Sequence, residues 1–250
     1  MRKDSDLVLG VIQARCSSTR LPNKSMTFIH EKSMFEWVYR RALNAKSLSG
    51  LVVATSTAPS DDKLYYYCRQ RRIPVYRGSL DDVLLRYYKL AEAFKAKHVV
   101  RLTGDCPLID PKVIDKVVNK HIAHDMDYTS NVIKPTYPDG LDVECISFYA
   151  LADTHQNAVS EVDRQHVTQY ILKRQDYFRC LSVENDKDLS SHRWTVDEKE
   201  DLEFVMSVYD YFVGKQKKQI FYMSDILKFI QLNPNIVVND KFKRNEGLLK

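Results

Sequence analysis

The chain has 250 residues, of which 44% are hydrophobic and 28% charged, so a sizeable hydrophobic core in one large or two small domains is feasible. The formal net charge of +5 is spread along the sequence. It suits an anionic substrate, but the concentrated basic stripe of a nucleic-acid binder is absent, so we expect no nucleic-acid partner. The five cysteines are odd in number and form no Cys-x-x-Cys pair, which argues for reduced thiols in a cytoplasmic protein and against a disulfide framework or a zinc site.

The first predicted element is a strand over residues 7–12, an apolar run typical of a strand buried on both faces. The run is too short for a signal-peptide core or a membrane span, so we expect no membrane partner. The loop that follows carries Arg15, Arg20 and Lys24 among hydroxyl side chains. Arginine and lysine side chains bind phosphates well, although the loop matches neither a P-loop nor Gly-x-Gly-x-x-Gly. A solvated surface loop is an equally good interpretation of this composition.

The chain up to about residue 120 alternates between strands and helices. We predict helices that begin after Ser33, at 59–62, at 81–82 and at Pro111 with Asp110 as N-cap, and strands at 51–54, 73–76 and 98–102. This alternation predicts an α/β fold with a mostly parallel central sheet and helices on both faces. Ligands bind such sheets at the carboxyl ends of the strands, so the polar loops after Ile12, Ala54 and Leu102 should converge.

The second half is less regular. We predict strands at 126–131, 141–146, 178–183 and 193–197, and helices at 161–174, after Asp197 and at 221–229, with a loosely held tail. The strand at 141–146 alternates apolar and polar residues, which predicts a half-exposed strand with Asp142 and Glu144 on one face. Whether these two carboxylates bind substrate hydroxyls or face solvent is left open.

Two aspartates follow predicted strands. Asp105 lies in a turn after a buried strand, and Asp197 ends a strand about 90 residues later. A carboxylate in this place, with no large side chain beside it to pair with, commonly holds a divalent cation, and Mg²⁺ needs only one or two protein carboxylates. With Arg15 and Lys24, the set suits attack on a nucleotide phosphate through charge neutralisation and alignment. Either aspartate alone is more simply interpreted as a turn or cap residue.

Other chemistries have less support. His166 could act as a general base, but a lone helical histidine is more often structural, and no Gly-x-Ser-x-Gly elbow is present. Two further classes rank lower. One is a nucleotide- or RNA-binding relative that has lost its chemistry, which the presence of both Asp105 and Asp197 disfavours. The other is a glycosyltransferase that uses Asp125-Met-Asp127, which is disfavoured because this motif precedes a predicted strand instead of ending one.

Residues 11–24 resemble a known signature. They are similar to the loop Ala-Arg-x-x-Ser-x-Arg-Leu-Pro-x-Lys of the cytidylyltransferases that make CMP-activated acidic sugars, nearest the spore coat polysaccharide F-type branch, relatives of the CMP-Kdo and CMP-sialic acid synthetases. The resemblance continues through 53–56, 77–84, 101–109, 137–144, 165–168 and 193–202, almost the whole chain. Ser17 and Asn23 stand where relatives often have glycine. Asparagine tolerates left-handed backbone better than most residues, so the loop can keep its shape.

The resemblance implies a single nucleotidyltransferase domain over 1–250 with the nucleotide-diphospho-sugar transferase (GT-A-like) fold. It implies transfer of CMP from CTP to an acidic sugar of the Kdo or nonulosonic-acid type, with Mg²⁺ and release of pyrophosphate. A phosphorylated or phosphonate acceptor is the second choice. Segment 126–170 would bind the acceptor and contribute to a homodimer contact.

The resemblance also implies roles for individual residues. Arg15, Lys24 and Asp105 would be catalytic, and Asp105 and Asp197 would hold the metal. The nucleotide would contact Gln13, Ala14, Arg15, Lys24, Ser56, Arg77, Gly78 and Ser79. The acceptor would contact Tyr128, Asn131, Asp139, Asp142, Glu144, Gln165 and His166.

Overall fold

A computed structural model describes residues 7–17 and 21–236. Three residues of the predicted phosphate loop, Ser18, Thr19 and Arg20, lie outside the described residues, as does most of the tail that we expected to be loosely held. Among the described residues, no helix combines the length and the apolar character needed to cross a membrane. All five cysteines are free thiols.

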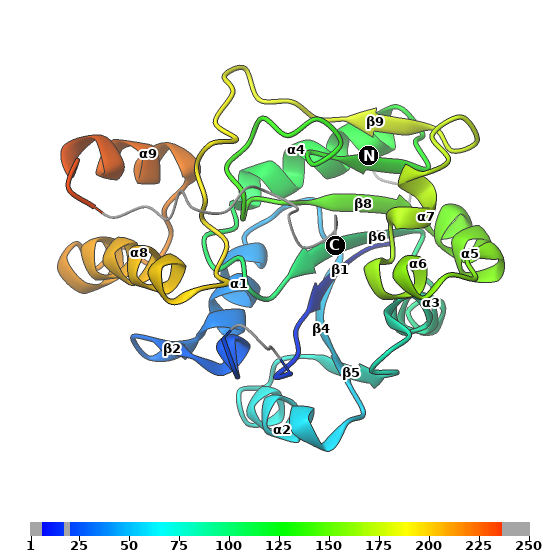
Figure 1. Cartoon of the computed structure of the whole chain (residues 1–250), viewed down its shortest axis with the longest axis horizontal. Coiled ribbons are helices and arrows are strands. Elements are labelled where there is room, and N and C mark those ends of the chain that lie inside the picture. The colour runs from blue at the N-terminus through cyan, green and yellow to red at the C-terminus, as the bar shows by residue number, and fades with distance from the viewer. Residues whose placement is uncertain (1–6, 18–20, 237–250) are drawn as a thin grey trace.

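A seven-stranded sheet in the order β5-β4-β1-β6-β8-β7-β9 forms the centre of the fold (Figure 1). Its strands are β1 (Val8–Gln13), β4 (Gly50–Ser56), β5 (Val75–Gly78), β6 (His98–Thr103), β7 (Tyr128–Ser130), β8 (Glu144–Ser147) and β9 (Cys180–Ser182). The pairs β5–β4, β4–β1, β1–β6 and β7–β9 are parallel, whereas β8 is antiparallel to both of its neighbours. The predicted mostly parallel sheet is therefore confirmed. A small hairpin is formed by β2 (Phe28–Ile29) and β3 (Lys32–Ser33).

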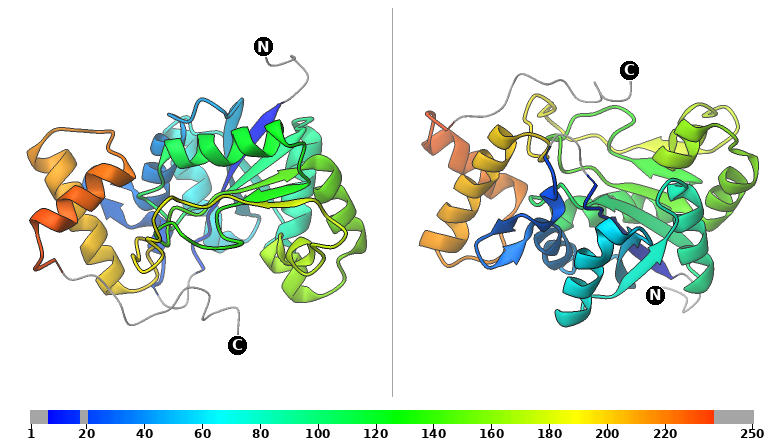
Figure 2. Two further views of the ribbon diagram at one scale, coloured as in Figure 1. Left: turned by 90° about the horizontal axis from the view of Figure 1, so that it is seen from above. Right: turned by 60° about the horizontal axis from the view of Figure 1, so that its bottom comes forward.

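Helices cover both faces of this sheet, as predicted. One apolar cluster joins the sheet to α1 (Met34–Ala42), α2 (Asp62–Gln70), α4 (Pro111–Ala123), α8 (Lys199–Tyr209) and α9 (Met223–Leu232). The other joins it to α3 (Val83–Ala93), α5 (Phe148–Asn157) and α7 (Gln169–Leu172), and α6 (Glu161–His166) packs beside α3. Short helical turns are η1 (Lys24–Met26), η2 (Pro59–Asp61) and the π-helix η3 (Asp210–Lys215). Figure 2 shows α8 and α9 at one end of the molecule and α5 and α6 at the other.

The alternation of side chains along β1 explains how one strand serves both clusters. Val8 and Ile12 belong to the cluster with α1, and Leu9 and Val11 belong to the cluster with α3. Successive strand residues point to opposite faces, so a strand in the middle of this sheet must be apolar throughout. The prediction of a strand buried on both faces is confirmed.

Three predicted elements differ from the structure. The single helix expected at 161–174 is broken into α6 and α7 at Val167, whose φ of 56° is unfavourable for a β-branched residue. The half-exposed strand expected at 141–146 is wrong, because β8 lies between β6 and β7 and its residues are mostly buried. Segment 193–197 is not a strand and makes one isolated bridge, between Asp139 and Arg193.

The predicted cap at Asp110 is confirmed. Its side chain accepts a hydrogen bond from the Lys112 amide (2.8 Å) at the start of α4 and another from the Met223 amide (2.6 Å) at the start of α9. A similar cap is formed by Asp82, which precedes α3 instead of lying in its first turn. Asp110 therefore ties together two helix starts far apart in sequence.

Replacing Asp110 by alanine should lower the free energy of unfolding by about 2 kcal/mol, because two partly buried amides at helix starts lose their acceptor. Urea unfolding followed by circular dichroism measures this change. Asp188→Ala is the control, since Asp188 makes its contacts to Ser190 on the surface and should matter little. Equal stabilities of the Asp110 and Asp188 variants would contradict the assignment.

Candidate active site

A cavity of about 320 Å³ opens at the carboxyl ends of β1 and β6. These neighbours flank the point where the strand order changes direction, since the chain passes from β1 to β4 on one side while β6 pairs on the other. Crevices at such points are the usual ligand sites of open α/β sheets. We call it the β1 cavity; its lining includes the predicted site residues Gln13, Ala14, Arg15, Lys24, Asp105 and Asp197. The loops after β1 and β6 converge here as predicted, but the loop after β4 does not line the cavity.

The two converging loops are held by backbone contacts. The amide of Gly104 donates to the carbonyl of Gln13 (2.8 Å), and a Cβ on Gly104 would lie only 2.9 Å from the Cβ of Ala14. Only glycine allows this approach without displacing the loop. The ends of β1 and β6 are thereby fixed beside each other.

Asp61, which the sequence analysis treated only as the opening of a helix, holds the β1 loop from below. The buried carboxylate accepts hydrogen bonds from the amides of Cys16 (2.7 Å) and Ser56 (3.1 Å) and from the Ser56 hydroxyl. Burial would raise the pKa of Asp61, but these hydrogen bonds outweigh it and lower the pKa. An aspartate before a helix is common, so nothing in the sequence distinguished this role.

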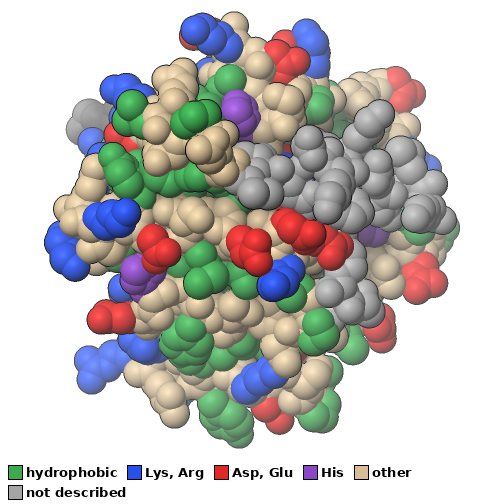
Figure 3. Space-filling model, turned by 60° about the vertical axis from the view of Figure 1, so that its left-hand side comes forward, with side chains coloured by type: hydrophobic (Ala, Val, Ile, Leu, Met, Phe, Trp, Pro, Cys, Tyr) green, Lys and Arg blue, Asp and Glu red, His purple; other side chains and the backbone are tan. Residues whose placement is uncertain are grey.

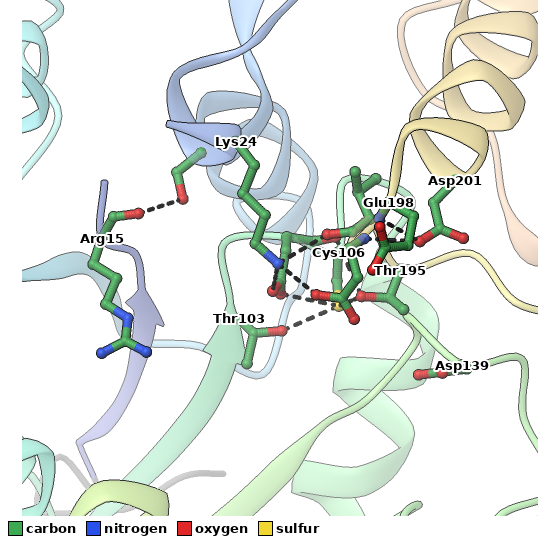
Figure 4. A network of polar contacts seen from close by, with 12 residues as sticks. Arg15, Lys24, Thr103, Cys106, Asp139, Thr195, Glu198 and Asp201 are labelled. Carbon is green, nitrogen blue, oxygen red and sulfur yellow. Dashed lines mark hydrogen bonds and ion pairs between the residues drawn. The ribbon is translucent and has the colours of Figure 1, made fainter. Parts of the chain in front are cut away.

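Lys24 lies between the two predicted metal ligands. Its ammonium donates to Oδ2 of Asp105 (2.7 Å), to Oδ1 of Asp197 (2.7 Å) and to the carbonyl of Val196 (2.9 Å). Figure 4 draws the contacts of the Lys24 ammonium as dashed lines. Burial would lower the pKa of Lys24, but the two carboxylates outweigh it and raise the pKa. The same interaction lowers the pKa of Asp105 against the effect of burial. The expectation that these carboxylates have no large partner is therefore wrong.

Asp197 lies beside Asp105 although segment 193–197 is not a strand of the sheet. The amide of Val196 donates to the carbonyl of Asp105 (2.9 Å), which fixes segment 193–197 against the end of β6. Arg193 then orients Asp197 through a 3.1 Å contact to its Oδ2. Asp201, at the start of α8, accepts from the Asp197 amide (2.9 Å).

Arg15 contributes a second cation to the cavity. Its backbone carbonyl accepts from the Ser25 hydroxyl (3.0 Å), which anchors the residue, and its guanidinium lies apart from the carboxylates in Figure 4. Within residues 7–17 and 21–236, no carboxylate forms an ion pair with Arg15. The guanidinium therefore offers its donors to an anion entering the cavity.

A second cavity of about 140 Å³, here the β8 cavity, adjoins the first and shares Arg101 and Thr103 with it. Three predicted acceptor residues line it: Asp142, Glu144 and His166. Burial, together with nearby Arg101 and Arg15, lowers the pKa of His166, which favours the neutral imidazole. The strained Val167 sets His166 and Thr168 into this cavity from the break between α6 and α7.

Arg101 is the main residue that the sequence analysis missed. It forms an ion pair with Glu144 across the β6–β8 ladder, and Glu144 also accepts from the Tyr128 hydroxyl (2.6 Å). Burial would raise the pKa of Glu144, but Arg101 and Tyr128 outweigh it and lower the pKa. An arginine within a strand predicted to be buried was the available signal, because a buried charge needs a partner.

Several predicted acceptor residues line neither cavity. Asn131 bonds the backbone at Leu141 and Val143, and Tyr128 lies behind Glu144. Asp139 pairs with Arg193 (3.2 Å), and Gln165 bonds the exposed Glu161 on its own helix; each of these four side chains therefore has a contact within its own chain.

Four of the residues predicted to contact the nucleotide also lie outside the lining of both cavities: Ser56, Arg77, Gly78 and Ser79. The Ser56 hydroxyl bonds Asp61, and Arg77 bonds the Ser56 carbonyl and pairs with Asp62 (2.6 Å). Gly78 faces Arg86, and the Ser79 carbonyl accepts from Arg86 (2.9 Å). Their role in nucleotide binding stays a prediction. Asp125 and Asp127 pair with Arg179 before β7, at the opposite edge of the sheet, which removes support for a glycosyltransferase metal motif.

The residues present fit a magnesium ion. Two carboxylates already hold one cationic group between them at 2.7 Å each, and oxygen ligands are what Mg²⁺ prefers. The described residues contain no cluster of three or more metal-binding side chains, so phosphate and water oxygens would complete the shell.

Glu144→Gln should lower the free energy of unfolding by about 3 kcal/mol near pH 7, because it leaves the largely buried Arg101 beside a neutral group. The folded-state pKa of Glu144 is lowered, so the ionised form stabilises the protein above the ordinary carboxyl pKa and this contribution is lost as pH falls through the folded value. The difference from the unchanged chain should therefore be constant from about pH 5 to 8 and shrink below about pH 4.

Denaturant unfolding at several pH values tests this difference. Glu184→Gln is the matched control, since its pair with Lys134 is exposed and should contribute far less. A difference that does not change with pH would argue against an ionised buried pair.

The sequence matches a family of known proteins over most of its length. The family model described as cytidylyltransferase matches residues 9–241. The chain is 31% identical to an uncharacterised protein of Methanocaldococcus jannaschii over 92% of both chains. It is 32% identical to the spore coat polysaccharide biosynthesis protein SpsF of Bacillus subtilis over 81% of this chain and 86% of that protein.

Solved structures agree with the sequence relatives. A cytidylyltransferase from Leptospira borgpetersenii superposes with a TM-score of 0.89 at 29% identity, covering 96% of this chain and all of the other. A CMP-2-keto-3-deoxy-manno-octonic acid synthetase solved with CTP superposes at 0.62 with 16% identity over 82% of this chain and 99% of that chain, a likeness of fold alone. The chain belongs to the cytidylyltransferase family and is a CTP-dependent nucleotidyltransferase.

Proposed function

We propose that this protein transfers CMP from CTP to an acidic sugar of the Kdo or nonulosonic-acid type and releases pyrophosphate. The observation that carries the proposal is the meeting of Arg15, Lys24, Asp105 and Asp197 in one cavity at the carboxyl edge of the sheet. These residues come from three distant segments, and the contact of Lys24 with both carboxylates brings the segments together.

On the nucleotide side, Arg15 and Lys24 would bind the triphosphate and take up the charge of the leaving pyrophosphate. Asp105 and Asp197 would hold Mg²⁺, whose bound charge would neutralise phosphate oxygens at the reacting phosphorus. An acceptor oxygen would form a bond to the α-phosphorus as the bond to the bridging α–β oxygen breaks. The acceptor hydroxyl proton would leave to solvent or to a neighbouring base.

On the acceptor side, the polar lining of the β8 cavity favours binding of a molecule with several hydroxyl groups. Asp142 and Glu144 offer carboxylate oxygens, and Thr168 adds a hydroxyl. Arg101 lies where the two cavities meet, close to the place where an acceptor oxygen must reach the nucleotide. An anionic group beside the attacking oxygen would therefore lie near cationic side chains, while hydroxyls farther along the molecule would face the carboxylates.

A phosphorylated or phosphonate acceptor is the second candidate, because the same cations would receive it. An RNA-binding relative without chemistry has less support. On the described part of the face in Figure 3, Lys and Arg side chains are interspersed with Asp and Glu and form no broad basic patch.

We also propose that segment 126–170 contributes to a homodimer contact. Large apolar side chains of this segment are exposed, with 66% of Tyr149, 93% of Val159 and 52% of Val162 accessible. Burying such side chains against a second copy would be favourable.

Asp105→Asn should lower kcat/KM by roughly 100-fold or more, because a charged group aligned with the triphosphate is lost. Pyrophosphate release is measured with CTP, UTP, ATP and GTP in turn, against Kdo, N-acetylneuraminate and a phosphonate acceptor. The exposed Asp176→Asn is the control and should retain full activity. No turnover with CTP and any acceptor, or full activity of Asp105→Asn, would contradict the proposal.

Arg15→Gln should weaken CTP binding about tenfold or more, because it removes a charge-assisted contact to phosphate. Isothermal titration of CTP with Mg²⁺ measures the dissociation constant without needing the acceptor. The control is Arg69→Gln on the exposed end of α2. CMP should bind with a smaller difference between the Arg15 variant and the unchanged chain, and an equal loss for CMP and CTP would argue against a triphosphate contact.

A further inference from the structure

The ammonium of Lys24 fills the space between the two carboxylates of the site. It has three donors, and all three are used by Asp105 Oδ2, Asp197 Oδ1 and the carbonyl of Val196. Only 12% of the Lys24 side chain is accessible. A metal ion held between both carboxylates would lie in the space that the ammonium fills, and closer to the carboxylate oxygens than the ammonium does.

Backbone contacts hold the segments around Lys24, whereas the Lys24 ammonium is held only by its own three side-chain contacts. Asn23 has a left-handed backbone (φ 60°) that opens η1, and Ser25 bonds the carbonyl of Arg15. Asp197 is oriented by Arg193 and by the bond between Val196 and Asp105. The four-carbon stem of lysine is flexible, so its ammonium can leave while the backbone stays in place.

We propose that Lys24 and a divalent cation compete for Asp105 and Asp197, and that an incoming triphosphate relieves this competition by drawing Lys24 onto its phosphates. The inference rests on the proposed function. Two cations repel each other at these distances, whereas a triphosphate supplies the lysine with another anionic partner. Lys24 thus makes metal binding at this site depend on the nucleotide.

The proposal has a thermodynamic consequence. If the triphosphate raises the affinity for the metal, the metal raises the affinity for the triphosphate by the same factor. Direct bonds between metal and phosphate contribute to that coupling with or without the lysine. The part due to Lys24 is therefore isolated by measuring metal binding with no nucleotide present.

The experiment is a titration with Mn²⁺ alone, whose free ion is counted by electron paramagnetic resonance. We expect Lys24→Met to bind Mn²⁺ about tenfold or more tightly than the unchanged chain, within the usual range of coupling between two ligands. Lys134→Met removes the same charge from an exposed ion pair outside both cavities and should leave the affinity unchanged. Adding Asp105→Asn to Lys24→Met should abolish the gain.

Two more variants and a thermal-melting measurement keep the proposal testable if Lys24→Met folds poorly. Lys24→Gln keeps hydrogen-bond donors without the charge and should shift Mn²⁺ affinity in the same direction. In thermal melting, Mn²⁺ should stabilise Lys24→Met more than the unchanged chain, because it replaces the missing positive charge. Lys24→Arg keeps the positive charge, so its affinity for Mn²⁺ should not exceed that of the unchanged chain.

Equal Mn²⁺ affinities of Lys24→Met and the unchanged chain would overturn the proposal, as would a gain that survives Asp105→Asn. Its failure is distinct from failure of the proposed function. If the unchanged chain transfers CMP but Lys24→Met shows no change in Mn²⁺ affinity, only the proposed competition is wrong. If Lys24→Met gains Mn²⁺ affinity but the unchanged chain does not transfer CMP, the competition is supported and the proposed reaction is wrong.

Discussion

The contact of Lys24 with Asp105 and Asp197 is the interaction around which the rest of the site is arranged. It joins residues separated by 81 and 173 positions in the sequence. Bringing buried charges together is costly unless each one is paired. The fold meets this requirement by placing β1 beside β6 and by fixing the Asp197 segment on the carbonyl of Asp105. The cationic loop and the acidic segment are therefore parts of one electrostatic unit.

A second constraint links the two sides of the site. The β1 and β8 cavities share Arg101 and Thr103, which lie two residues apart on β6, so their side chains point to the same face of the strand. Arg101 is also bound to Glu144 on the antiparallel strand, so any shift of β8 would move charges in both cavities. The antiparallel strand thus extends the parallel half of the sheet and lines the β8 cavity, where we propose that the acceptor binds.

Much of this arrangement could be predicted from local patterns. The alternation of strands and helices predicted a sheet with helices on both faces. The position of Asp105 after a buried strand predicted that it lies at the carboxyl ends of the parallel strands. What failed depended on tertiary contacts. Segment 161–174 has a continuous helical pattern, but Val167 breaks it. Segment 193–197 looks like a strand, yet it binds the end of β6 without joining the sheet.

The site residues follow the same division. Arg15 and Lys24 could be named because cations gather in one loop, and Asp142 and Glu144 because they alternate along one segment. Arg101 and Asp61 were missed because their roles depend on partners 43 and 45 residues away. Asn131 and Gln165 were expected to contact an acceptor, but both bond their own chain. Side-chain type indicates chemistry, whereas packing decides whether the side chain faces a cavity.

The most direct test of the account is a crystal structure of the protein with CTP and Mg²⁺. The account predicts a triphosphate between Arg15 and Lys24, a metal ion on Asp105 and Asp197, and the Lys24 ammonium moved from the carboxylates to phosphate oxygens. A nucleotide bound outside the β1 cavity, or one bound inside it with Lys24 still between the two carboxylates and no metal there, would contradict it.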